Sequence, residues 1–254
     1  MDLVTYERSG DLAVLHLDDG QANVFSPAMI EALNAALDRA EQDGAIVVIH
    51  GRPGVLSGGF DLKVFKAGGM NALTMMKAGF ELAGRLLAFP RPVVVASTGH
   101  AMAMGAFLLL SADYRIGAAG DFRVQANEVA IGLTMPHAAI AICRHRLAKR
   151  HFDRAVLLSE AYSPETAVDA GFLDRVVPPD QVLAAAMEHA QSLTQLDAHA
   201  HAQSKLRTRA ETLKALKKGT ATDMRELTVL GLKRMFGGKK GSDGASPKTP
   251  HAEG

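Results

Sequence analysis

The chain of 254 residues contains a single cysteine, Cys143. One thiol cannot form an internal disulfide, and the sequence has no Cys-x-x-Cys pair or His-Glu-x-x-His motif to hold a metal ion. We expect a reducing, cytoplasmic setting, with no metal or redox cofactor. The N-terminus, MDLVTYERSGD, lacks the segments of a signal peptide, and no apolar run reaches the roughly 20 residues that span a bilayer. We therefore expect no membrane partner.

The chain also lacks an excess of either charge. It has 28 Lys and Arg against 27 Asp and Glu, a formal net charge of +1, so no field points to nucleic acid as a partner. It has no G-x-G-x-x-G fingerprint, no G-K-[ST] loop and no G-x-S-x-G nucleophile motif. Its 48% hydrophobic content fits one ordinary domain, or one core with a helical extension.

Alternating apolar segments and turns favour an α/β fold. Residues 4–8 and 12–17 predict a hairpin, and the apolar run 45–50 predicts a covered strand. Residues 51–59 form a predicted glycine-rich loop, and a turn is expected at residues 97–100. Further strands are expected at 93–96, 113–117, 122–124 and 173–177, and helices at 27–42, 71–88, 135–148, 151–159, 164–170 and 181–193.

The pattern changes after residue 195. Residues 197–236 are helical and charged without a strand, and their leucines are expected to pack on the core or on another subunit. We expect a core at residues 1–195, a helical region at 196–236 and a disordered tail at 237–254. Basic residues in the helical region are expected on a solvated face: Lys205, Arg207, Arg209, Lys214, Lys217 and Lys218.

Two segments of small residues each follow a predicted strand. Residues 101–106 lead into an apolar helix, and Ser57, Gly58 and Gly59 precede Phe60. Small residues let a ligand approach the backbone, and the first N–H groups of a helix have no partner within it. Two such donors stabilise an oxygen that gains negative charge. An ordinary buried helix and an ordinary surface turn remain the alternatives.

Glu128 stands among apolar residues in FRVQANEVAIGLTMP, residues 122–136. Apolar surroundings remove water from a carboxylate, which raises its pKa and suits it to act as a general base. A loop glutamate in a salt bridge or a cap is the alternative.

These pieces, taken in order, resemble the crotonase (enoyl-CoA hydratase/isomerase) superfamily. Each motif alone is weak, but five in the right order across residues 3–195 are specific. The resemblance implies a spiral of ββα units with C-terminal helices that build trimers, often paired into hexamers, and a site for acyl-CoA. The motifs are NVFS at 23–26, GRPGVLSGGFDL at 51–62, STGHAMAMGAF with SADYRI at 97–116, NEVAIGLTMP at 127–136 and AVDAGFLDRVVP at 167–178.

Carried over by motif, the resemblance implies that the N–H groups of Phe60 and Met104 polarise the thioester carbonyl and that Glu128 is catalytic. Lys63 and a few basic residues of the C-terminal helix are candidates for coenzyme A phosphates, although a solvated Lys63 is equally compatible. Asp61 is expected to cap its loop. Coenzyme A enters as part of the substrate, with no separate cofactor. The residues expected to contact the substrate or coenzyme A are Ala22, Val24, Ser57, Gly59, Asp61, Leu62, Lys63, Gly105, Phe107, Asn127 and Ile131.

One departure from the family pattern decides the expected chemistry. Hydratases of this family use two glutamates, and the first lies three residues after the second oxyanion donor, where this chain has Phe107. A 1,3-proton shift needs only one base, so we expect a 3-enoyl-CoA to become a 2-enoyl-CoA through Glu128. NEVAIGLTMP is also similar to the NExxxGIxxP of Δ3,Δ2-enoyl-CoA isomerases, which carry an apolar residue at the position of Phe107.

Alternatives remain within and outside this chemistry. The same fold supports hydration, decarboxylation and thioester hydrolysis, and a non-catalytic acyl-CoA-binding subunit would also lack the first glutamate. Met104 replaces a glycine, which leaves the shape of the acyl pocket and the aim of its N–H open. Acyl chain length, branching and pathway are not encoded in these motifs.

Overall fold

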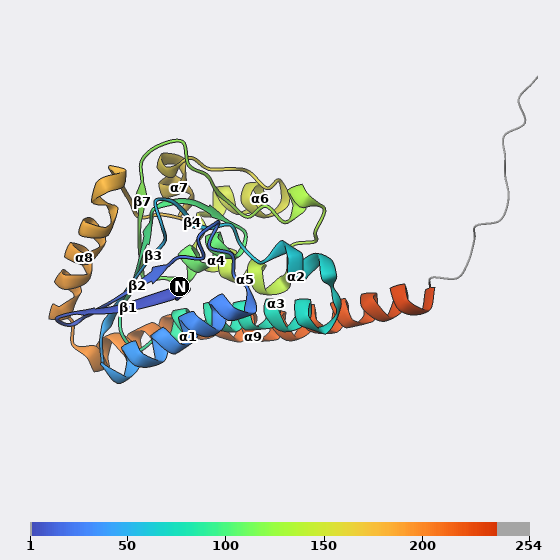
Figure 1. The fold of residues 1–254 in the computed structure, drawn as a ribbon, viewed down its shortest axis with the longest axis horizontal. Helices are drawn as coiled ribbons and strands as arrows, with labels where there is room; N and C mark the ends of the chain where they lie inside the picture. Colours follow the sequence, from blue (N-terminus) through green and yellow to red (C-terminus); the bar gives the residue numbers. More distant parts are fainter. Residues whose placement is uncertain (1, 238–254) are drawn as a thin grey trace, which may run out of the picture.

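The computed structural model describes residues 2–237, which form two β-sheets of mainly parallel strands with helices around them (Figure 1). Among the strand pairs within residues 2–237, β1 and β2 pair antiparallel, as the predicted hairpin requires, and the other pairs are parallel. The main sheet holds, in spatial order, β1 (Val4–Ser9), β2 (Leu12–Leu17), β3 (Ile46–His50), β5 (Val93–Ser97), β7 (Tyr114–Ala118) and β9 (Arg175–Val177). The second sheet holds β4 (Gly54–Ser57), β6 (Gly99–Met102) and β8 (Val124–Gln125).

Helices connect and cover these strands. Ser26 caps the first helix, with Pro27 at its first position, as the sequence predicts. The α-helices are α1 (Pro27–Gln42), α2 (Leu62–Ala67), α3 (Gly69–Ala88), α4 (Met104–Ser111), α5 (His137–Arg146), α6 (Lys149–Leu157), α7 (Pro164–Ala170), α8 (Val182–Ser192) and α9 (Ala198–Gly237). Three short 3-10 helices are η1 (Val129–Ile131), η2 (Pro179–Gln181) and η3 (Leu193–Gln195).

The predicted ββα units are confirmed. In the first unit both strands, β1 and β2, lie in the main sheet before α1. In the later units one strand enters the main sheet, the next enters the second sheet, and a helix follows, as in β5, β6 and α4. The prediction of loops at residues 51–59 and 97–100 is wrong, because both stretches contain strand residues. A Cβ on Gly99 would lie 2.0 Å from the carbonyl carbon of Gly54, so these glycines permit close strand pairing.

Alternate residues of the main sheet face two different layers. Leu12 and Val14 of β2 pack toward α8, whereas Leu15 and Leu17 pack toward the larger core with α1, α3, α4 and α5. Figure 1 shows α8 alone on one side of the sheet. The larger core therefore lies on the side of the main sheet that also carries the small-residue segments 57–60 and 101–106.

The helical pattern predicted at residues 197–236 is a single helix, α9, that runs beside α3 and α5 and extends past them in Figure 1. Leu216 is buried, and a Cβ on Gly84 of α3 would touch it at 3.4 Å. The division of the chain into a core and a helical region stays a prediction. Residues 238–254 of the predicted tail lie outside the described residues.

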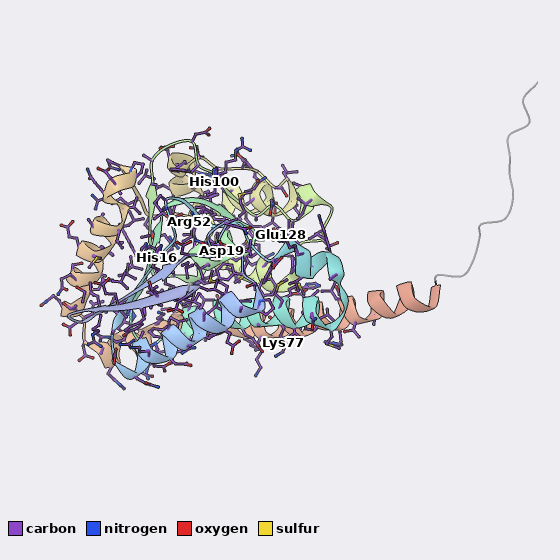
Figure 2. All side chains as sticks on the ribbon, in the orientation of Figure 1. His16, Asp19, Arg52, Lys77, His100 and Glu128 are labelled. Atoms are coloured by element: carbon purple, nitrogen blue, oxygen red, sulfur yellow. The ribbon has the colours of Figure 1, made fainter. Side chains whose placement is uncertain are left out.

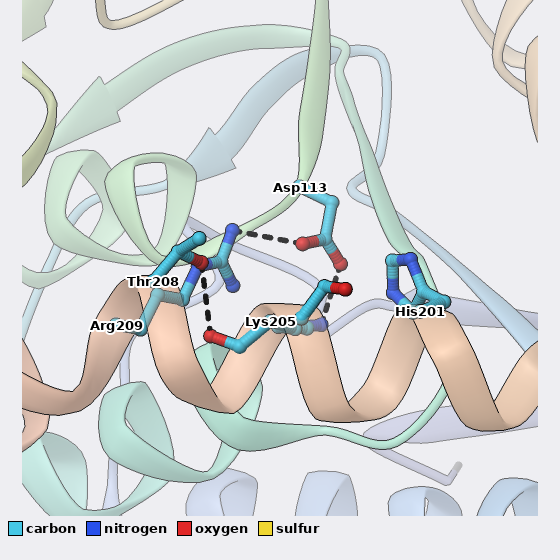
Figure 3. A pocket seen from close by; sticks show the side chains of 6 residues that line it. Asp113, His201, Lys205, Thr208 and Arg209 are labelled. Carbon is cyan, nitrogen blue, oxygen red and sulfur yellow. Dashed lines mark hydrogen bonds and ion pairs between the residues drawn. The ribbon is translucent and has the colours of Figure 1, made fainter.

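Asp113 anchors the first half of α9 (Figure 3). Its Oδ2 accepts from Lys205 Nζ at 2.6 Å and its Oδ1 from Arg209 at 2.8 Å. Arg209 also donates to the carbonyl of Leu87. The expectation of a solvated face is therefore wrong for Lys205 and Arg209, whose side chains are only 3% and 8% exposed. Burial lowers the pKa of Lys205 to about 8. The remaining basic residues of that face are exposed, as expected.

The part of the chain that the structure describes contains no helix long and apolar enough to cross a bilayer. Nor does it contain a group of three or more His, Cys, Asp or Glu side chains placed to hold a metal ion.

Candidate functional site

The structure brings the two small-residue segments into contact. Gly59 has a φ of +94°, and a Cβ there would lie 2.8 Å from the Cβ of Ala103 and 3.5 Å from the nitrogen of Met104. A Cβ on Gly105 would lie 2.7 Å from the carbonyl oxygen of Ser57. Glycine is therefore required on both sides of the contact, and its absence of a Cβ lets Gly59 lie close to the Met104 amide.

The two predicted backbone donors are both available. Met104 is the first residue of α4, so its N–H has no helical partner. Within residues 2–237, neither this N–H nor that of Phe60 donates to an acceptor. Ala103 precedes α4 with a φ of +47°, an unfavourable angle for a residue with a Cβ, and it turns the chain into the helix.

Hydrogen bonds fix the Phe60 side of this contact. Ser57 Oγ donates to the carbonyl of Asn23 at 2.6 Å and accepts from the N–H of Gly59 at 3.1 Å. The Gly58 N–H donates to the carbonyl of Ala22, and the Phe25 N–H to that of Gly59. The strand-like segment 22–25 therefore lies along residues 58–60, with Ala22 and Val24 beside the loop; their predicted contact with the substrate or coenzyme A stays a prediction.

The Met104 side chain has a defined place in the core. It is fully buried, and its Sδ lies 3.6 Å from the position of a Cβ on Gly79 in α3. The Phe60 ring approaches the same position to 2.4 Å. Gly79 thus accommodates both side chains, and the Met104 thioether packs against α3.

Glu128 is buried, with 6% of its surface exposed, at the residue before η1. Burial raises the pKa of Glu128 to about 7. Its Oε2 has no hydrogen-bond partner in the described chain. Burial also raises the pKa of the nearby Cys143 thiol, so the thiol stays neutral. Figure 2 shows Glu128 on the side of the molecule away from α8. A buried carboxylate with a free oxygen and a pKa near neutrality can accept and return a proton.

The segment of Glu128 is joined directly to the segment of Met104. β6 and β8 pair Met102 with Gln125, and the N–H of Ala103 donates to the Gln125 carbonyl at 2.9 Å. Glu128 follows Gln125 by three residues. The segments that carry Glu128 and Met104 therefore belong to one hydrogen-bonded unit.

Phe107 lies one turn after Met104 and is fully buried against Phe80, with ring centroids 6.3 Å apart. It supplies no acid. Among the side chains described in residues 2–229, the buried carboxylates are Glu128 and Asp223. Both oxygens of Asp223 accept from backbone N–H groups at the start of α5, at 2.8 and 3.0 Å. Glu128 is therefore the buried carboxylate that retains an unpartnered oxygen.

The other predicted residues divide between the site and the surface. Asp61 caps α2 by accepting from the N–H of Lys63 at 2.7 Å, which confirms its predicted capping role. The Lys63 side chain is exposed. Leu62 and Ile131 are 55% and 50% exposed, and thus available to an apolar ligand. Sequence reasoning missed Gln125 and Ser159, which contact the segment of Glu128 through hydrogen bonds that no local pattern predicts.

A family model described as enoyl-CoA hydratase/isomerase matches residues 7–237. A peroxisomal enoyl-CoA delta isomerase 2 from Arabidopsis thaliana is 32% identical over 68% of this chain and 76% of its own length. A Mycobacterium tuberculosis structure described as an enoyl-CoA isomerase is 46% identical, covers 89% of this chain and 99% of that chain, and has a TM-score of 0.86. A second structure of that same protein, described as a probable enoyl-CoA hydratase, is 45% identical, covers 94% of this chain and 100% of that chain, and has a TM-score of 0.88.

Proposed function

The chain belongs to the enoyl-CoA hydratase/isomerase family and has the crotonase fold, and we propose that it shifts the double bond of a 3-enoyl-CoA to give a 2-enoyl-CoA. The main support is Glu128, a buried carboxylate with a free oxygen and a pKa of about 7, in a site where Phe107 replaces a second acid. The names of the relatives include both isomerases and hydratases, so the residues must decide the reaction.

In the proposed reaction, Glu128 removes a proton from the carbon next to the thioester carbonyl. The electrons of that C–H bond form a dienolate whose negative charge lies on the thioester oxygen. The N–H groups of Phe60 and Met104 donate to this oxygen. Glu128 then returns its proton to the far carbon of the original double bond, which leaves the double bond conjugated with the carbonyl. The carboxylate is regenerated, and the reaction requires no metal or redox group.

Substrate contacts form part of the same proposal. Ala22, Val24, Asp61 and Lys63 lie on the segments beside the Phe60 loop and are assigned to coenzyme A. Leu62 and Ile131 expose apolar side chains for the acyl portion. We assign Ser57, Gly59, Gly105, Phe107 and Asn127 to the shape of the site. Self-association as a trimer or a hexamer, expected from the family resemblance, is tested by sedimentation equilibrium.

The experiment supplies a 3-enoyl-CoA and a 2-enoyl-CoA separately and resolves the products by chromatography. We expect the first to be isomerised and the second to gain no water. Glu128→Gln is expected to lose roughly 10²–10⁴ of the rate while still binding a saturated acyl-CoA. Glu188→Gln, an exposed change on α8, is the matched control and should be unaffected.

Other outcomes assign other functions. Hydration of the 2-enoyl-CoA would show that a group other than Phe107 supplies the second acid. An unchanged isomerisation rate in Glu128→Gln would remove the single-base mechanism. Binding without turnover in the unaltered protein would favour a non-catalytic acyl-CoA-binding subunit or another acyl reaction.

A further inference from the structure

Ser159 contacts the Glu128 segment on both sides of the carboxylate. Its Oγ accepts from the N–H of Ala130 at 3.1 Å, two residues after Glu128. Its carbonyl oxygen accepts from the side-chain nitrogen of Gln125 at 2.6 Å, three residues before Glu128. Ser159, which follows α6, therefore bridges residues 125 and 130, the short stretch of chain that carries Glu128.

The backbone of Ser159 has a φ of +49°, which is unfavourable for a residue with a Cβ. The residue is also buried, with only 7% of its surface exposed. A non-glycine residue in this region costs roughly 1–3 kcal/mol unless the surroundings impose it. The neighbouring segment does impose it, because Tyr162 and Val124 exchange two backbone hydrogen bonds of 3.0 Å. The chain around residue 159 is thereby held alongside β8.

Gln125 extends this contact to the oxyanion donor. Its side chain donates to Ser159, and its backbone carbonyl accepts from the N–H of Ala103, the residue before Met104. Ser159, Gln125 and Ala103 thus form a continuous path of hydrogen bonds between the base segment and the second donor.

We propose that Ser159 is a positioning residue that fixes the Glu128 carboxylate relative to the Met104 N–H. The inference rests on the proposed function, because it assigns Ser159 a role in the same site. Displacing a catalytic group by about 1 Å costs on the order of 10²-fold in rate. Loss of the Ser159 hydroxyl is therefore expected to act on the chemical step rather than on substrate affinity.

The test compares Ser159→Ala with Ser163→Ala in the full chain. Ser163 Oγ accepts from the backbone N–H of Thr166 at 3.3 Å, donates to Glu165 Oε2 at 2.9 Å and contacts Thr166 Oγ1 at 3.3 Å. Ser163→Ala therefore removes a hydroxyl with at least as many hydrogen bonds, none of them to residues 125–133. Ser159→Ala is expected to lower kcat for the 3-enoyl-CoA by roughly 10–100-fold and to leave the dissociation constant of a saturated acyl-CoA within about two-fold. Ser163→Ala should leave both quantities within about two-fold. A kcat in Ser159→Ala within two-fold of the unaltered protein would overturn the inference.

Hydrogen exchange measured by mass spectrometry gives a readout independent of turnover. Amides of residues 125–133 should exchange at least about ten-fold faster in Ser159→Ala and be unchanged in Ser163→Ala. Ser159→Gly removes the same hydroxyl while relieving the backbone strain, so it should show the same losses even if Ser159→Ala folds poorly. Unchanged exchange in Ser159→Gly would overturn the inference. If the unaltered protein and Glu128→Gln have equal rates, the proposed function fails, and the exchange data still decide whether Ser159 holds the segment.

Discussion

Gly59 faces the amide of Met104 so closely that a Cβ on Gly59 would lie 3.5 Å from the Met104 nitrogen. The same Cβ would clash with Ala103 Cβ at 2.8 Å, and the φ of +94° is unfavourable for alanine. Gly59→Ala should therefore displace the second donor and lower kcat/KM by roughly 10²–10³, the usual effect of losing one oxyanion donor. Steady-state kinetics check this against Gly58→Ala, whose Cβ meets its nearest neighbour at 3.4 Å. Equal losses in both variants would contradict a specific role for the Gly59 contact.

The pH dependence of the reaction should report the ionisation of Glu128. Burial raises its pKa to about 7. In the proposed reaction, Glu128 removes a proton only when its carboxylate is ionised. We expect kcat/KM to rise about ten-fold per pH unit below this value and to level off above it. Rate measurements from about pH 3.5 to 9 check this, since this range includes both pKa values. An inflection near the ordinary pKa of 4.5 would show that Glu128 is not desolvated in solution.

Glu128→Gln should stabilise the protein at alkaline pH. Because the folded-state pKa of about 7 lies above the ordinary 4.5, the folded chain binds more protons than the unfolded chain between these values. The free energy of unfolding therefore falls as pH rises from about 4.5 to about 7. Above pH 7 it stays lower than at pH 4, by at most about 3 kcal/mol. Urea unfolding should show a gain for the variant at pH 8 and none at pH 4. A gain of equal size at both pH values would be inconsistent with a buried charge.

Asp113→Asn should destabilise the docking of α9. The change leaves Lys205 and Arg209 buried without their carboxylate, which costs roughly 3–5 kcal/mol when one partner of a buried pair is removed. Glu81→Gln is the control, because the Lys77–Glu81 pair is 53% and 58% exposed and contributes about 0.5 kcal/mol or less. Equal unfolding midpoints for the two variants would show that the Asp113 cluster contributes no more than a surface pair.

Asp223→Ala should weaken the start of α5. The change leaves the N–H groups of His137 and Ala138 without their acceptor, at a cost of about 2–3 kcal/mol. Asp197→Ala, which removes an exposed cap of α9 itself, should cost about 1 kcal/mol. Denaturant unfolding of the two variants measures the difference, and a smaller loss for Asp223→Ala than for Asp197→Ala would exclude this capping role.

Local patterns predict the features that depend on neighbours in sequence. The apolar residues around Glu128 predict its burial, and Ser26 with Pro27 predicts the start of α1. The strands β4 and β6 escape detection because they have only four residues each and include glycines that usually mark turns. Their pairing becomes visible only when Gly54 and Gly99 are brought together.

Features that depend on distant partners could not be predicted. The sequence pattern predicts Lys205 and Arg209 to be solvated. Their partner, Asp113, lies more than 90 residues earlier in the chain, so no local pattern reveals the ion pairs. Ala103 and Ser159 adopt positive φ angles without being glycine, so composition gives no sign of them. Strain of this kind is imposed by tertiary contacts, which explains why it occurs at the candidate site.

The cap of α5 has a consequence for the order in which the chain folds. Asp223 lies 86 residues after His137, and its carboxylate accepts a hydrogen bond from the His137 N–H. A growing chain therefore contains the Glu128 segment and all of α5 well before the carboxylate that holds the first turn of that helix. Contacts between residues so distant in sequence form late, because a long loop must close first. The first turn of α5, which follows the Glu128 segment, is therefore expected to gain its cap only after α9 has been synthesised and docked.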